Sequence, residues 1–213
     1  MSKKILPLVT LLVCAPAAAH AHPHVFADAR LEIVAGDDGK VSELHNIWRF
    51  DEVFSSSVLM DFDKNTNLKL DPDELEEIGK TVLASLEEFS YYTTLTDNGK
   101  PVKVAKPDMI HVDYKDGQLL MFFAIKPAAP MALKGKLTFG IYDPTLYASI
   151  DFPSDKDVVL MGKFDACKSA IVRPDPDEVI AENKSSLTDA FFNDPTGTDM
   201  SKLFATRAEV TCQ

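Results

Sequence analysis

The first part of the chain alternates between apolar and polar residues with a period of two. From His24 to Val34 the odd-numbered positions are apolar, and most even-numbered positions are polar or charged. Such alternation is typical of a half-buried strand. The residues from Gly36 to Gly39 have turn composition, and an apolar-rich strand pattern returns over residues 41–50. The two segments are therefore predicted to form a β-hairpin.

A pair of helices is predicted after this hairpin, over residues 51–62 and 71–89. The second segment repeats its apolar residues at helical spacing, so that they share one face. The residues of that face are Leu75, Ile78, Val82, Leu83 and Leu86. We therefore expect a helical insertion over about 51–89.

The strand pattern resumes at Tyr91. Strands are predicted at 91–96, 102–105, 109–114, 118–126, 136–142, 147–152 and 157–163. A further helix is expected over 177–192, and a final strand over 205–212. The predicted fold class is α+β: one domain, residues 22–213, of mostly antiparallel sheet with the inserted helix pair and a disulfide-tied C-terminal segment.

The N-terminus has the composition of a secretory signal peptide. Lysines at positions 3 and 4 precede an apolar stretch over residues 5–19, and a small residue on each side of position 20 favours cleavage after Ala21. We expect residues 1–21 to be removed and the protein to be periplasmic. The alternative is a lipid anchor at Cys14, which is disfavoured because the preceding residue is Val13 rather than a small one.

The charge of the chain excludes some classes of partner. It has 33 acidic and 22 basic residues, for a net charge of −11. An acidic surface repels nucleic acid and anionic lipid, so neither is expected to bind. It is compatible with binding cations.

Two cysteines, Cys167 and Cys212, remain after removal of the leader. An even pair in an oxidising compartment predicts a disulfide. The alternative is two unrelated buried thiols. An oxidised pair provides no nucleophile for catalysis.

The connection between the two predicted helices resembles an EF-hand calcium loop. Oxygen ligands are expected at positions 1, 3, 5, 7, 9 and 12 of such a loop. The residues at these positions are Asp63, Asn65, Asn67, Lys69 (through its carbonyl), Asp71 and Glu74. Leu68 departs from the pattern, because the sixth position needs a left-handed backbone that favours glycine. We therefore expect weak calcium binding at best, and the alternative is an Asn-rich turn that only connects two helices.

A second candidate site is the mature N-terminus, where His22 and His24 flank a proline. Imidazole and amine nitrogens are suitable ligands for zinc, nickel and copper. The hairpin register predicted from its turn would place His24 opposite Asp51 or Glu52, with His45 deeper along the same hairpin. Two histidines and a carboxylate form a common metal shell. The alternative is a solvated terminus without metal.

Other polar residues favour structural roles. His111 lies in a predicted strand and is expected to be a half-exposed strand residue, and Asp143 is expected to cap a turn. The sequence has no nucleotide-binding glycine loop, no nucleophile elbow and no two-cysteine metal motif. An enzyme is therefore disfavoured.

Five sequence blocks together resemble one known family. They are His22–Phe26, His45–Ser55, Leu70–Leu75, Tyr142–Thr145 and Val210–Cys212. The ordered set is similar to the ZevA-like periplasmic family. That resemblance implies metal traffic in company with a membrane permease of the nickel/cobalt type. Family members usually have Asn-Gly-Asp-Gly in the loop where this chain has Asn65-Thr-Asn-Leu68.

The expected function is a non-enzymatic periplasmic protein that binds zinc, with nickel or cobalt as alternatives, and hands it to a membrane permease. His22 and His24 are the expected primary ligands, completed by His45, Asp51 or Glu52. The second hypothesis is an interaction module that docks on the permease without binding a transition metal. A third is an enzyme with a copper ion held by an N-terminal histidine.

Overall fold

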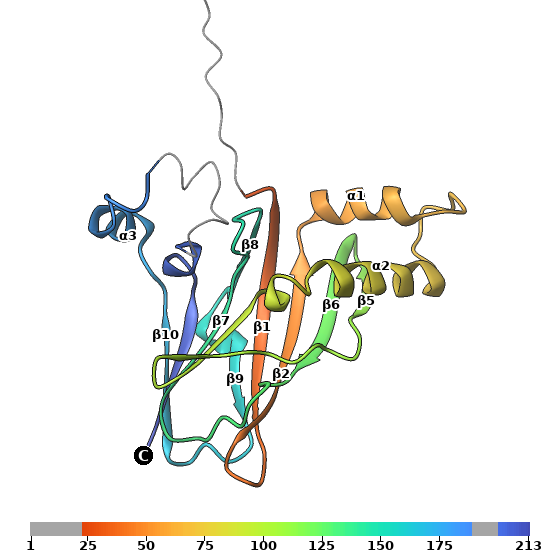
Figure 1. Ribbon diagram of the computed structural model, residues 1–213. Coiled ribbons are helices and arrows are strands. Elements are labelled where there is room, and N and C mark those ends of the chain that lie inside the picture. Colours follow the sequence, from red (N-terminus) through yellow and green to blue (C-terminus); the bar gives the residue numbers. More distant parts are fainter. Residues whose placement is uncertain (1–22, 189–199) are drawn as a thin grey trace, which may run out of the picture.

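The computed structural model describes residues 23–188 and 200–213 (Figure 1). It confirms the first hairpin, because β1 (Val25–Ala35) pairs antiparallel with β2 (Val41–Phe50). The odd-numbered apolar side chains of β1 from Val25 to Ile33 are buried, whereas those between them are exposed or half-buried. The alternation in the sequence therefore predicted correctly which face of this strand turns inward.

β1 lies inside the first of two sheets. The strand order is β5-β6-β2-β1-β8, and β9 also pairs with β1 further along its length. Both β8 and β9 run parallel to β1, whereas the other pairs are antiparallel. The remaining strands of this sheet are β5 (His111–Lys115), β6 (Gln118–Ile125), β8 (Ala148–Asp151) and β9 (Val158–Met161).

The second sheet has the order β10-β11-β7-β3-β4 and is antiparallel throughout. Its strands are β3 (Thr93–Asp97), β4 (Lys100–Val102), β7 (Gly135–Ile141), β10 (Cys167–Val172) and β11 (Arg207–Cys212). The fold class is therefore mixed α and β with mostly antiparallel sheets, as predicted, and the strands are divided between two sheets.

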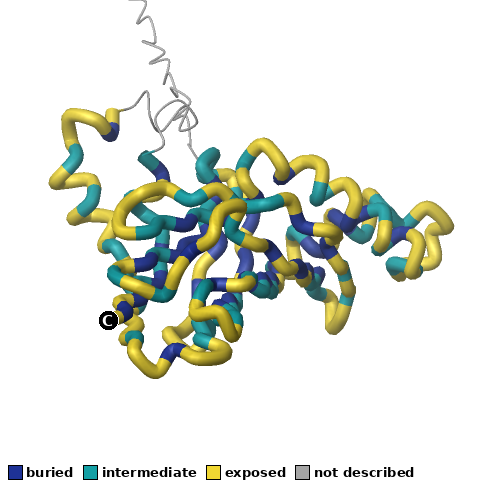
Figure 2. The backbone as a smooth tube through the Cα atoms, turned by 60° about the horizontal axis from the view of Figure 1, so that its bottom comes forward, coloured by how far each residue is buried: buried dark blue, intermediate teal, exposed yellow. Residues whose placement is uncertain are grey.

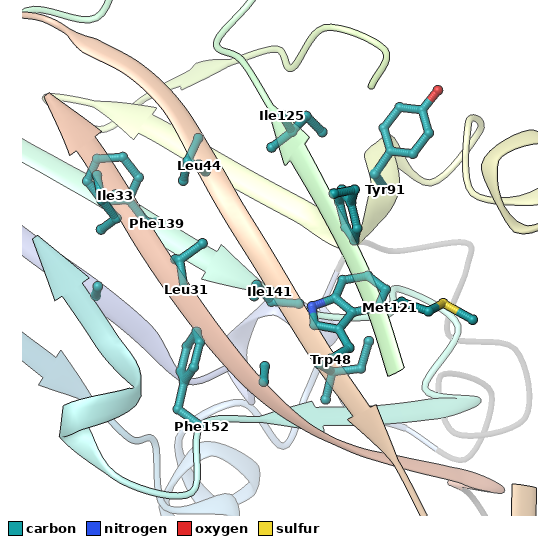
Figure 3. Packing of buried hydrophobic residues seen from close by; sticks show 14 of the residues in the cluster. Leu31, Ile33, Leu44, Trp48, Tyr91, Met121, Ile125, Phe139, Ile141 and Phe152 are labelled. Atoms are coloured by element: carbon teal, nitrogen blue, oxygen red, sulfur yellow. The ribbon is translucent and has the colours of Figure 1, made fainter. Parts of the chain in front are cut away.

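The core lies between the inward faces of the two sheets (Figure 3). Leu31 and Ile33 contribute from the first sheet, and Phe139 and Ile141 contribute from the second. Trp48 is only 1% exposed, and its ring centroid lies 4.9 Å from that of Phe123. Buried aromatic pairs of this kind supply a large share of core stability.

Helices α1 (Glu52–Phe62) and α2 (Pro72–Ser85) pack beside the edge of the first sheet that is formed by β5 and β6. Ser55 in α1 accepts a hydrogen bond of 2.9 Å from the backbone N–H of the buried residue Leu119 in β6. Gly79 in α2 lies so close to Ile110 that a Cβ atom would sit 2.3 Å from its carbonyl oxygen. Figure 1 shows the pair extending sideways, away from the second sheet.

α3 (Pro176–Glu182) is the third helix and lies on the opposite side of the molecule from α1 and α2 (Figure 1). In residues 23–188 and 200–213, no helix combines the length and the apolar character needed to cross a membrane.

Several predicted boundaries need correction. The strand expected at 102–105 is the short edge strand Lys100–Val102, and the helix expected at 177–192 is α3, which ends at Glu182. Residues 189–192 lie outside the described residues. β10 was not predicted, because its residues 168–170 are all exposed and do not alternate in polarity.

The predicted disulfide between Cys167 and Cys212 is confirmed. The two cysteines are direct partners in the pairing of β10 with β11. The bond therefore fixes one end of the edge strand β10, which has few buried side chains of its own.

We predict that replacing both cysteines with serine (Cys167→Ser with Cys212→Ser) strongly destabilises the domain. The bond joins residues 45 positions apart. Closing a loop of this length is worth about 4 kcal/mol in the chain-entropy model. Urea unfolding of the double variant, followed by circular dichroism, measures the loss. An unfolding free energy equal to that of the oxidised wild type would contradict the prediction.

Candidate functional site

The N-terminal end of β1 is the first place where candidate residues gather. The backbone N–H of His24 donates to the carbonyl oxygen of Tyr147 at 2.8 Å, and that of Val25 donates to the same oxygen at 3.2 Å. The ring of His24 also lies against that of Tyr147, with centroids 5.1 Å apart. Both side chains are exposed. His24 is therefore held in place by its backbone, while its ring remains accessible.

Asp143 organises the loop that carries Tyr147. Its carboxylate accepts hydrogen bonds from the backbone N–H of Thr145 at 2.7 Å and from that of Ala148 at 2.9 Å. The hydroxyl of Thr145 donates to the same carboxylate at 2.7 Å. The predicted turn-capping role of Asp143 is confirmed, and this buried carboxylate fixes the position of the loop against β1.

Tyr92 adds a further contact to this carboxylate. Burial raises the pKa of the Tyr92 phenol well above its ordinary range, and the charge of Asp143 and a hydrogen bond to it act in the same direction. Residues Ser90, Tyr91 and Tyr92 all have positive φ angles, between 52° and 55°. Such a left-handed turn costs on the order of 1–2 kcal/mol per residue. The turn places Tyr92 beside Asp143, between the two sheets.

Asp51 caps the first helix rather than facing His24. One carboxylate oxygen accepts from the backbone N–H groups of Val53 and Phe54, and the other accepts from that of Phe26 at 3.0 Å. The predicted hairpin register is therefore wrong by two residues, because Asp51 lies beside Phe26 and not opposite His24. Two features each shift the register by one residue: the turn closes between Gly36 and Lys40, and a bulge lies between Val34 and Ala35.

The other two predicted ligands near Asp51 in the sequence are Glu52, which follows it in α1, and His45, which precedes it in β2. Glu52 is exposed in the first turn of α1, directly after Asp51 and so near the start of β1. His45 is six residues before Asp51 along an extended chain, a span of about 20 Å. His45 thus lies far from the N-terminal end of β1. His22 lies outside the described residues.

His45 makes its own cluster on the outward face of the first sheet. Its Nε2 lies 2.9 Å from a carboxylate oxygen of Glu43, and its Nδ1 lies 3.3 Å from one of Glu32. Arg30 in turn donates to Glu32 at 3.1 Å. Because carboxylates contact both ring nitrogens, the doubly protonated imidazolium satisfies both contacts best.

No group of three or more His, Cys, Asp or Glu side chains within 23–188 and 200–213 is arranged to hold a metal ion. The four predicted transition-metal ligands that lie within the described residues are accordingly not brought together into one shell. His24 and Glu52 lie toward the start of β1, Asp51 is occupied by backbone donors, and His45 faces Glu32 and Glu43.

The loop between α1 and α2 is closed by its own polar side chains. Asp63 accepts from the backbone N–H groups of Asn67 at 3.1 Å and Leu68 at 2.7 Å. The side-chain amides of Asn65 and Asn67 both donate to one oxygen of Asp71, at 2.8 and 3.0 Å. The side chains of four of the six predicted calcium ligands are therefore joined by hydrogen bonds within the loop.

The remaining two predicted ligands have different environments. Glu74 is 3% exposed, and its carboxylate accepts from the backbone N–H of Lys64 at 2.8 Å and from that of Asp71 at 2.9 Å. The second contact closes a capping box at the start of α2. Lys69 contributes its backbone N–H to Asn67 at 2.8 Å.

A cavity of about 560 Å³ opens beside the N-terminal end of β1. Pro23, Leu146 and Ile150 form one side of it, and Ile180 and Phe204 contribute from the C-terminal part of the chain. The walls are mostly apolar, and the carboxylate of Asp143 within them is fully used by the loop contacts described above. The cavity therefore offers apolar contact rather than a set of ligands.

Tyr147 is the residue at this end that the sequence did not reveal. It follows the turn at residues 142–145, but nothing in its spacing from His24 links the two. The parallel pairing of β1 with β8, where Val25 is the partner of Ala148, brings them together. The turn sequence around Asp143 was the only local signal that this loop is ordered.

These features define a class: a disulfide-linked α+β protein with two facing sheets, a lateral helix pair and a strand β1 whose first residues are hydrogen-bonded to the loop before β8. The chain belongs to the family described as "Protein of unknown function (DUF1007)", which matches residues 7–212. No curated protein matches it.

We predict that Leu68→Gly stabilises the domain by about 1 kcal/mol. Leu68 has a φ of 62° and its side chain is 79% exposed, so glycine relieves backbone strain without loss of packing. Urea unfolding measures the change. The control is Lys69→Gly, a neighbouring loop residue with no positive φ angle, which is expected to stabilise nothing. A less stable Leu68→Gly variant would show that the left-handed backbone is not strained.

A further prediction concerns the pH dependence of His45. Glu43 raises the pKa of His45 above its ordinary value of 6.5, with Glu32 adding to the effect and partial burial opposing it. The stability contributed by the imidazolium is present below about pH 6.5 and is lost as pH rises through the raised pKa. Proton NMR titration of the ring measures this pKa, and Glu43→Gln is expected to lower it. Titration of wild-type His45 at or below 6.5 would be the contrary result.

Proposed function

We propose that this chain is a non-enzymatic periplasmic protein that binds a transition-metal ion, zinc, through its N-terminal segment and delivers it to a membrane permease. Nickel and cobalt are the alternative ions. Export rests on the composition of residues 1–21, and the permease rests on the resemblance to the ZevA-like family. In this role the metal ion is cargo.

The observation that carries the metal proposal is the placement of His24. Its backbone is tied to Tyr147 and its ring is exposed at the end of an interior strand. A ligand held this way loses little freedom on binding, which favours affinity. His22 and the amine created by cleavage after Ala21 supply further nitrogens two residues away.

The carboxylate partner of these nitrogens is best assigned to Glu52. Its side chain is exposed near the start of β1, whereas the Asp51 carboxylate already accepts three backbone hydrogen bonds. Replacing those bonds with a metal would leave the first turn of α1 without its cap. His45 is excluded from the same shell by its distance along β2.

The loop from Asp63 to Glu74 is proposed to be an EF-hand-like element that binds calcium weakly. Its oxygen-bearing side chains are of the type that calcium prefers, and the left-handed backbone at Leu68 has the form such a loop requires. Calcium there would stiffen the connection between α1 and α2. The strain at Leu68 and the two neutral Asn side chains lower the affinity.

A second candidate function is an interaction module that docks on the permease. It is favoured by the helix pair, which extends away from the second sheet (Figure 1). The helix pair and its connecting loop also carry exposed apolar side chains. The two functions are compatible, because the metal proposal uses the histidines and Glu52, whereas docking uses the exposed apolar side chains of the helix pair.

We predict that His24→Ala weakens zinc binding by the mature protein at least about tenfold, because one imidazole ligand is lost. His111→Ala is the matched control and leaves the affinity unchanged, since His111 lies in the edge strand β5. Adding one residue before His22 should also weaken binding, because the amine becomes an amide. Affinity should fall as pH drops through about 6.5, where imidazole is protonated.

Isothermal titration calorimetry with zinc measures all of these affinities. Unchanged affinity in His24→Ala would remove the N-terminal site and leave the docking function. Equal zinc affinity of the extended and native proteins would show that the terminal amine is not a ligand, and the two imidazoles would remain the proposed ligands.

A further inference from the structure

The most exposed large apolar side chains of residues 23–188 and 200–213 are concentrated in the helix pair. Val53 is 80% exposed, Leu68 is 79% and Met60 is 75%, whereas every other large apolar residue is at most 53% exposed. Scattered single apolar residues are ordinary on a surface. Here three apolar side chains that are each at least 75% exposed lie within the sixteen residues 53–68, so they form a group.

Two of the three share one face of α1. Val53 and Met60 are seven positions apart, which is nearly two helical turns, so their side chains point the same way about 10 Å apart. Ser56 and Ser57 lie between them and are also exposed. The opposite face of the helix, with the buried residues Ser55 and Val58, packs on the body of the protein.

The serines make this face less polar than the sequence suggests. The hydroxyl of Ser56 donates to the carbonyl oxygen of Glu52 at 2.7 Å, and that of Ser57 donates to that of Val53 at 3.2 Å. Each hydroxyl proton is therefore used within the helix. The outward face of α1 thus presents two apolar side chains separated by small residues, which allows another chain to approach closely. We call the residues Val53, Ser56, Ser57 and Met60 the α1 face.

The charge around the α1 face selects its partner. Residues 51–89 contain eleven Asp or Glu and three Lys, and thus carry most of the net charge of −11. α1 itself contains no basic residue. A second copy of this chain or an anionic membrane would be repelled by this field, whereas a segment with Lys or Arg would be attracted.

From these observations we infer that the α1 face is a docking surface for a basic polypeptide segment of another protein, anchored by apolar side chains on Val53 and Met60. The α1 face would be the surface used in the proposed docking function, and the partner would be basic and apolar; the inference rests on that function. It does not depend on metal binding at His24. Figure 2 shows the helix pair, with its mostly exposed outer side, as a separate projection of the molecule.

The test compares two short helical peptides of equal positive charge, one with Leu and Lys and one with Ser and Lys. The wild-type protein is expected to bind the Leu/Lys peptide at least about tenfold more tightly, because two apolar side chains are buried. The variant Val53→Ser with Met60→Ser should lose this preference while keeping all charges. The control Met109→Ser with Met161→Ser, at two other exposed methionines, should keep it.

Fluorescence anisotropy of labelled peptides gives the affinities, and circular dichroism shows that each variant is folded. Equal binding of both peptides by the wild type would overturn the inference, because charge alone would then explain the association. A preference that survives Val53→Ser with Met60→Ser would also overturn it. Binding to phosphatidylglycerol vesicles would overturn the inference as well, because a membrane would then occupy the α1 face. A dimer that the same substitutions dissociate would do so too, because a second copy of the chain would then occupy it.

Zinc calorimetry on the same variants separates this inference from the metal proposal. The Val53→Ser with Met60→Ser variant should bind zinc as the wild type does. Loss of zinc binding only in His24→Ala, with loss of peptide preference only in the α1 variant, is the expected pattern.

Discussion

The pairing of β1 on both of its sides is the constraint on which the rest of the structure depends. β2 and then β6 and β5 extend from one side, and β8 and β9 pair in parallel on the other. An interior strand cannot change register without turning its apolar side chains away from the core. The positions of α1, which continues from β2, and of the loop before β8 both follow from this strand.

The same pairing explains why the N-terminal end of β1 is ordered. His24 and Val25 are held by Tyr147, and Phe26 is held by Asp51, so opposite sides of the strand are tied at its first residues. The order here comes from the buried carboxylate of Asp143, which determines where the loop of Tyr147 lies. The first residues of β1 are thus fixed to the segments on both sides of the strand.

Only some features of the candidate sites could be predicted from the sequence. The spacing from Asp63 to Glu74 correctly placed a polar loop between two helices, because the oxygen-bearing residues and both caps are local features. The proposed partnership of His24 with Asp51 failed, because it assumed a regular hairpin, whereas the turn closes between Gly36 and Lys40 and a bulge follows Val34. Tyr147 was missed, because its contact with His24 depends on two segments more than 120 residues apart.

The sequence by itself determined the first hairpin, the two helices that follow it, most of the later strands and the cysteine pair. These features follow from local periodicity, turn composition and residue chemistry. Only the tertiary structure decided that the strands form two sheets, that β8 and β9 lie parallel to β1, and that the exposed segment 167–172 is a strand. The physical reason is that strand order and register depend on contacts between distant segments. The side chains of Val53 and Met60 are exposed for the same reason, since the tertiary packing of α1 leaves that face uncovered.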